Sequence, residues 1–171
     1  GIHRLHSGSP NTAVVPLLRA ARRALDEGRT PLALDAARLG MAAADRTGAL
    51  SARAEARLRL AEAYLDMDLP EDSRRVLDQI QDIGHLDRRT NAWIWVYLAR
   101  VEVARGALSS ARQYLESAQA AFDATRDREG LIYSNHGLGT VCRLEGTPSQ
   151  AANHYGRMLR MSVSDPRAEV M

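Results

Sequence analysis

The sequence repeats itself with a period of about 40 residues. In three copies a turn residue is followed five positions later by a small residue, then by a larger residue after four more positions and an apolar one after a further three, and the first copy follows this pattern more loosely. The intervals between successive turn residues are 40, 38 and 40 positions. Repeats of this length are typical of stacked helix–turn–helix units. The turn residues are Gly28, Asp68, Gly106 and Gly146.

Each part of the repeat has a physical reason. Gly or Asp at the turn accepts a left-handed backbone that ends the first helix, and the small residue lets the second helix approach closely. The two later residues lie on one helical face. Hydrophobic residues make up 45% of the chain but aromatic residues only 5%, so the core must be built from aliphatic side chains. These features predict an all-α fold.

The first helix of each repeat carries a second pattern. The tetratricopeptide pattern W-x2-L-G-x2-Y appears in the third repeat as Trp95, Leu98, Ala99 and Glu102. Over residues 12–161 the chain therefore resembles a tetratricopeptide-repeat (TPR) protein, although the proline that closes the usual 34-residue repeat is absent. The longer period, and the stretch 125–130 before the fourth repeat, resemble repeats of MalT-like and Rap-type bacterial regulators. The resemblance implies a right-handed α-solenoid of about four TPR-like helix pairs.

The repeat register predicts the organisation of the chain. We expect a polar leader over residues 1–11, which has the composition of a tag or linker, a repeat domain over 12–162, and a polar tail over 163–171. Pro31, Pro70 and Pro148 fall just inside second helices, where a missing N–H costs little. The expected repeats span residues 12–48, 51–86, 89–126 and 129–162.

Charge and cysteine content narrow the functional classes. All 23 basic residues are Arg, and 21 acidic residues nearly balance them, for a net charge of +2. Arginines are enriched in residues 1–60 and acids in 62–87, so the continuous basic face of a nucleic-acid-binding protein is not expected. A single cysteine, Cys142, excludes an intramolecular disulfide and a multi-cysteine metal site. Without a long apolar run, we expect a cytoplasmic protein.

Catalytic motifs are weak. Gly137 and Gly139 resemble the start of a dinucleotide loop, but the third glycine and the preceding strand are missing. Cys142 could pair with His136 as a nucleophile and base, yet Cys142 occupies a packing position of the repeat, where thiols are usually inert. We therefore expect no catalytic residues, no metal ligands and no cofactor.

The resemblance implies that ligands contact the concave side, lined by first helices. Trp95 falls in the packing pattern, so Trp93, two residues away, is expected to point into this groove. Aromatic and Arg side chains dominate binding hot spots, which favours a peptide or protein segment with an acidic group. The predicted groove residues are Arg19, Arg22, Glu55, Arg59, Glu62, Trp93, Tyr97, Arg100, Tyr133, His136, Thr140 and Arg143.

These observations predict a non-catalytic protein- or peptide-binding scaffold, expected to be the sensor or interaction region of a larger bacterial transcriptional or signalling regulator. Two alternatives stay open. A small-molecule sensor would stack its ligand on Trp93, Tyr97 and Tyr133, and a self-assembly module would form a homodimer through an uncapped end of the solenoid.

Overall fold

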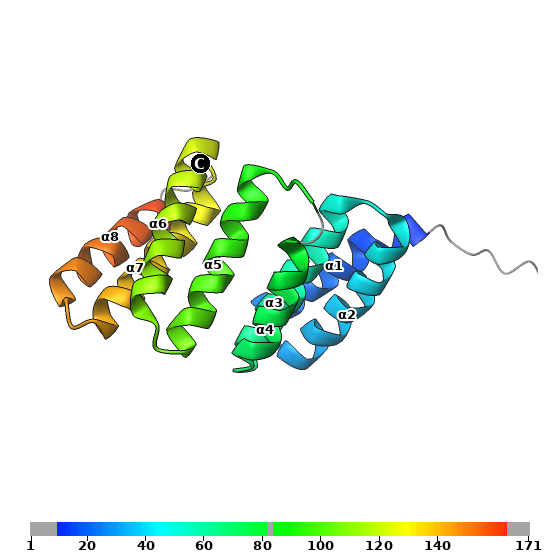
Figure 1. Cartoon of the computed structure of the whole chain (residues 1–171), viewed down its shortest axis with the longest axis horizontal. Helices are drawn as coiled ribbons and strands as arrows, with labels where there is room; N and C mark the ends of the chain where they lie inside the picture. Colours follow the sequence, from blue (N-terminus) through cyan, green and yellow to red (C-terminus); the bar gives the residue numbers. More distant parts are fainter. Residues whose placement is uncertain (1–9, 82–83, 164–171) are drawn as a thin grey trace, which may run out of the picture. The chain divides into compact units, whose positions relative to one another are not determined.

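The chain folds into helices, and the computed structural model describes residues 10–81 and 84–163. Over those residues it contains eight α-helices and no strand (Figure 1). The predicted all-α fold of four helix pairs is confirmed. The helices are α1 (Pro10–Asp26), α2 (Thr30–Thr47), α3 (Leu50–Asp66), α4 (Pro70–Gln81), α5 (Arg88–Ala104), α6 (Leu108–Thr125), α7 (Arg128–Leu144) and α8 (Pro148–Val163).

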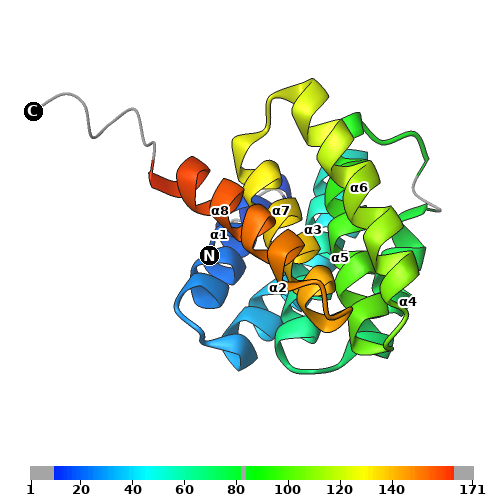
Figure 2. The same cartoon turned by 90° about the vertical axis from the view of Figure 1, so that its left-hand side faces the viewer.

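The helices belong to two compact units, divided between Leu86 and Asp87. In unit 1, α1 packs against α2 and α3 against α4, while α3 also contacts both helices of the first pair. Unit 2 repeats this arrangement with α5 to α8, and α7 contacts both α5 and α6 (Figure 2). Within each unit the two pairs therefore stack as TPR-like repeats do. A single repeat domain over 12–162 stays a prediction.

The predicted turn residues all have the expected backbone. Gly28, Gly106 and Gly146 have φ of 67°, 76° and 74°, and Asp68 has φ of 57°. A Cβ atom disfavours this left-handed region, which glycine adopts freely. The residue after each turn residue then donates its N–H to a carbonyl of the last helical turn, as Thr147 does to Cys142 at 2.9 Å. The periodic turn thus fixes where each first helix ends.

The first helix of each pair in unit 2 is capped by an aspartate. Asp87 accepts a hydrogen bond from the Thr90 N–H at 2.9 Å, and Asp127 accepts one from the Gly130 N–H at 3.1 Å. Each carboxylate satisfies one of the N–H groups that a helix leaves open at its start. The N-cap hydrogen bonds lower the pKa of Asp87, first through the Thr90 hydroxyl and then through backbone N–H groups, against an opposing effect of burial.

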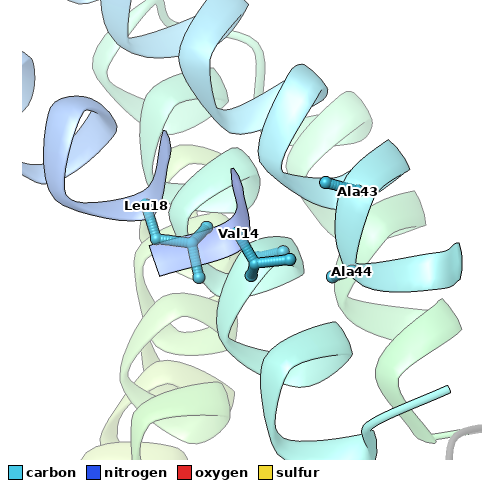
Figure 3. Close-up of a cluster of buried hydrophobic side chains, with 5 residues drawn as sticks. Val14, Leu18, Ala43 and Ala44 are labelled. Carbon is cyan, nitrogen blue, oxygen red and sulfur yellow. The ribbon is translucent and has the colours of Figure 1, made fainter. Parts of the chain in front are cut away.

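Small residues bring the paired helices together in unit 1. Val14 and Leu18 of α1 are nearly fully buried and belong to one cluster with Ala43 and Ala44 of α2. Figure 3 shows Val14 facing these alanines, with Leu18 next to Val14. The short alanine side chains leave room for the larger ones. The core of unit 1 is therefore built from aliphatic residues, as the composition predicts.

The same principle holds in unit 2. Leu115 of α6 packs in one cluster with Ala111 and with Leu138 and Val141 of α7. Gly139 lies against the Tyr155 ring of α8, since a Cβ at this glycine would be 2.6 Å from the ring. Cys142 is fully buried. The predicted packing roles of Gly139 and Cys142 are confirmed.

The ends of the predicted domain are only partly covered by the described residues. Helix α1 begins at Pro10, two residues before the expected start of the repeat domain. The remainder of the predicted leader, residues 1–9, and the predicted tail after Val163 lie outside the described residues. Among the helices that are described, none has the length and apolarity needed to cross a bilayer.

Candidate functional site

The predicted groove residues of unit 1 differ in accessibility. Arg19 and Glu55 are exposed, and Arg22 pairs with Asp26 along α1 at 3.1 Å. Arg59 and Glu62 pair within α3, where Nη1 of Arg59 lies 2.8 Å from the Glu62 carboxylate. Glu62 is only 6% exposed, so its expected role in an open groove is corrected. Its carboxylate is buried because Arg59 supplies the partner that a buried charge requires.

Two aromatic predictions are also corrected. Trp93 is 8% exposed and Tyr97 only 2%. The Trp93 ring centroid lies 5.2 Å from those of Phe122 on α6 and Tyr133 on α7, both in edge-to-face geometry. Helix α5 packs against α6 and α7, so the side that a single repeat would leave open is covered by the next repeat. Trp93 and Tyr97 therefore belong to the core of unit 2.

Trp95 was expected in the core, but it is half-buried. The relative burial of the two tryptophans is thus the reverse of the prediction. Arg100, on the same helix, is also half-buried. The α5 part of the predicted groove consequently offers little exposed aromatic surface.

The remaining predicted residues lie on α7, and two of them, His136 and Thr140, contact Tyr155 of α8. We call His136, Thr140, Arg143 and Tyr155 the terminal face. His136 and Arg143 are exposed, and the ring centroids of His136 and Tyr155 are 6.0 Å apart. The Thr140 hydroxyl donates to the His136 carbonyl at 3.1 Å and lies 3.3 Å from the Tyr155 hydroxyl. Because Thr140 has one hydroxyl proton, Tyr155 donates to Thr140. Tyr133, the fourth of these predicted residues, is half-buried against Trp93.

A comparison between repeats shows why this face is unusual. Positions 40 residues earlier, in the third repeat, carry Val96, Val103 and Leu115 where the fourth carries His136, Arg143 and Tyr155. Val96 and Leu115 are buried, and Val103 packs on the Leu115 cluster. The fourth repeat thus replaces residues suited to stacking with polar and aromatic residues that are accessible.

A second surface of unit 2 was missed by the sequence reasoning. Helices α6, α7 and α8 border an open hollow of about 500 Å³. None of the predicted groove residues lines it. The only sequence signal is the spacing of polar residues by three or four along α6 and α8, which any solvated helix shares. Residues that line the hollow include Glu116, Asp123, Leu131, Asn135, Arg157 and Arg160.

Arg112 of α6 lies at the centre of an ionisable cluster in unit 2. The Arg112 guanidinium donates to the Glu145 carboxylate and lies 3.4 Å from Sγ of Cys142. These two partners raise the pKa of Arg112, with Glu145 the larger cause. The Cys142 thiol in turn lies 3.8 Å from Oε1 of Gln150. Within residues 10–81 and 84–163, no three His, Cys, Asp or Glu side chains come together as a metal site would require.

Comparisons with known proteins leave the family open. No protein-family model matches the sequence, and no curated protein matches it. Among solved structures, the chain is similar to one described as the crystal structure of MamA protein, with 15% sequence identity and a TM-score of 0.47. That likeness covers 94% of this chain and 98% of the other. The helix pairs and their packing themselves show an all-α repeat fold of the TPR-like kind.

Proposed function

We propose that this chain is a non-catalytic module that binds a segment of a protein partner on the terminal face. The observation that carries the proposal is the change of residue type at equivalent repeat positions. Where the third repeat has Val96 and Val103, the fourth has exposed His136 and Arg143. Imidazole, guanidinium and phenol groups suit recognition, because they combine apolar contact area with hydrogen bonding.

The terminal face is also held in position before any partner arrives. Tyr155 lies on Gly139 and donates to Thr140, whose own hydroxyl is bonded to the α7 backbone. Fixing these side chains in advance lowers the entropy that binding would cost. An acidic group on the partner would suit Arg143, which forms no ion pair with any described residue.

The wider context is part of the same proposal. The repeat length supports a role as the sensor or interaction region of a larger bacterial regulator of the MalT-like or Rap-type kind, acting in the cytoplasm. The small-molecule alternative relied on Trp93, Tyr97 and Tyr133, and the first two are core residues, so it is not proposed. Homodimer formation stays a prediction, checked by the dependence of solution mass on concentration.

Affinity capture from extract of the native cells tests the proposal, with the parent chain compared to a His136→Ala/Arg143→Ala variant. Captured proteins would be identified by mass spectrometry, and each candidate would be purified and titrated against both chains. We expect a partner that binds the parent and whose affinity for the variant is lower by about tenfold or more. A tenfold loss corresponds to about 1.4 kcal/mol of binding free energy. Equal affinity for both chains would remove the terminal face from the proposal. Arg88→Glu, an exposed substitution at the start of α5, is the matched control.

A further inference from the structure

The hollow between α6, α7 and α8 has walls of opposite charge. Glu116 and Asp123 stand on α6, seven positions apart and therefore on one side of that helix. Arg157 and Arg160 stand on α8, three positions apart. Leu131 of α7 contributes apolar surface between them. An occupant of this hollow therefore meets acidic groups on one side and basic groups on the other.

Two of these charges have no partner within the chain as described. Asp123 and Arg157 are both exposed, and neither forms an ion pair with another described residue. Glu116 is only loosely engaged, because its carboxylate lies 3.9 Å from Nη1 of Arg112 and its side chain is 58% exposed. Asp123 on one wall and Arg157 on the other thus keep their charge available for a ligand.

The base of the hollow is rigid. Asn135 is 2% exposed, its amide donates to the Leu131 carbonyl at 2.8 Å, and its Oδ1 lies 3.3 Å from Nδ1 of His154. Burial lowers the pKa of His154, and the neighbouring Arg157 and Arg112 lower it further against the opposing effect of Glu116. The imidazole is therefore neutral at neutral pH and leaves the charge of the walls unchanged.

The α8 wall is tied to α7 by a side chain. Arg128, at the start of α7, donates through Nε to the Met161 carbonyl at 2.9 Å. This bond satisfies a carbonyl near the C-terminal end of α8, which the helix itself leaves open. The guanidinium also places positive charge at the negative end of the helix dipole. Arg128 therefore holds the α8 wall, with Arg157 and Arg160, at a set distance from α7.

We propose that this hollow is a second binding site, which takes a peptide segment carrying a cationic side chain toward α6 and a carboxylate toward α8. The inference rests on the proposed function, since the occupant is again a protein segment. A polyanion such as nucleic acid would be repelled by Glu116 and Asp123, and a purely basic segment by Arg157 and Arg160. A volume of about 500 Å³ accommodates a few side chains. Complementary charge would set the orientation of the segment.

Selection from a phage-displayed library of random peptides tests this site with the full chain as bait. Each selected peptide would be synthesised and its affinity measured by fluorescence anisotropy against five chains. These are the parent, Arg157→Glu, Asp123→Lys, His136→Ala/Arg143→Ala and the control Arg88→Glu. Circular dichroism and thermal unfolding confirm that each variant is folded, which we expect since every substituted position is exposed.

We expect a class of peptides with both a basic and an acidic residue, whose affinity falls by about tenfold or more for Arg157→Glu and for Asp123→Lys, with no change for Arg88→Glu. Replacing the basic residue of such a peptide by Glu should restore its affinity for Asp123→Lys. This reciprocal rescue is the decisive readout, because general damage to the fold would not be repaired by a change in the peptide.

Three other results would overturn the inference. Peptides that lose affinity for His136→Ala/Arg143→Ala but not for the hollow variants would leave the terminal face as the site and remove the hollow. Selection of no peptide would count against the hollow and against the proposed function together. Peptides of a single charge sign that ignore Asp123→Lys would contradict the proposed chemistry. Conversely, peptides sensitive only to the hollow variants would support this site and count against the terminal face.

Discussion

Gly130 of α7 lies directly against the ring of Phe122 on α6. A Cβ at Gly130 would overlap the ring carbons, and Phe122 is fully buried. The ring also meets Trp93 edge-to-face, so it cannot move aside without disturbing a second aromatic residue. The Gly130 N–H also donates to the Asp127 carboxylate that caps α7, which fixes the position of the Gly130 backbone. Because neither the ring nor this backbone can move away, the position requires a residue as small as glycine.

Gly130→Ala should destabilise the chain by about 1–3 kcal/mol, the usual cost of overpacking a core. Gly156→Ala on α8 is the matched control, since a Cβ there would meet only the end of Arg160 at 3.4 Å. The control should gain up to about 1 kcal/mol from helix propensity. Urea unfolding measures both, and equal effects of the two substitutions would contradict the close packing at Gly130.

Trp93→Ala should cost about 3–5 kcal/mol in unfolding free energy, as expected for removal of a buried aromatic side chain. The half-buried Trp95 should cost less when replaced by Ala. Chemical denaturation followed by circular dichroism distinguishes the two. A larger loss for Trp95→Ala would restore the original assignment, in which Trp95 is the core residue and Trp93 the groove residue.

Ser73→Ala should be neutral or stabilising by about 1 kcal/mol, because the Ser73 hydroxyl is buried without a hydrogen-bond partner among the described residues. The other repeats already carry Ala at this position, as at Ala111 and Ala151. Ser134 is equally buried, but its hydroxyl donates to the Leu131 carbonyl at 3.2 Å. Ser134→Ala should therefore be the less favourable of the two in thermal unfolding. The reverse order would show that the Ser73 hydroxyl has a partner.

Asp68→Gly should stabilise the chain by about 0.5–1 kcal/mol, since Asp68 is the only one of the four periodic turn residues that carries a Cβ in the left-handed region. Asp68→Ala keeps the Cβ and should give no gain. The midpoint of urea unfolding measures the difference. Equal midpoints for the Gly and Ala variants would mean that the Asp68 backbone carries no conformational cost.

Asp45 and Arg57 link α2 to α3 and should make part of the stability dependent on pH. Nη1 and Nη2 of Arg57 lie 2.8 and 3.0 Å from the two Asp45 oxygens. These bonds lower the pKa of Asp45 below its ordinary value of 3.8, against an opposing effect of burial. Because the folded pKa is the lower one, the stabilisation is complete above 3.8 and is lost as the pH falls through the folded value.

The difference in unfolding free energy between the parent and Asp45→Asn should therefore be constant near neutral pH and shrink in acid. Asp35→Asn, at an exposed position of α2, is the control and should follow the pH dependence of the parent. Urea titrations across the acid range provide the measurement. If the unfolding free energies of the parent and Asp45→Asn differed by the same amount at every pH down to the lowest, the assigned ion pair would be contradicted.

Much of the fold follows from local features of the sequence. The left-handed turns at Gly28 and Gly146, and the packing role of Gly139, depend on backbone sterics and on spacing along one helix. Such properties act between residues close in sequence, so a 40-residue period is enough to reveal them. The repeat pattern also predicts which helices pair, because short turns force consecutive helices to be neighbours.

Which side of each helix remains open was decided only by the tertiary structure. Trp93 and Trp95 differ in burial because α6 and α7 together cover one face of α5. Phe122 of α6 and Tyr133 of α7 contact Trp93 and thereby close the face on which it lies. The hollow likewise combines Asp123 of α6 with Arg157 of α8, which are distant in sequence. A periodic pattern shows that a helix has an inner and an outer face. The rotation of that helix, and hence its accessible residues, depends on side-chain packing between helices that the pattern does not contain.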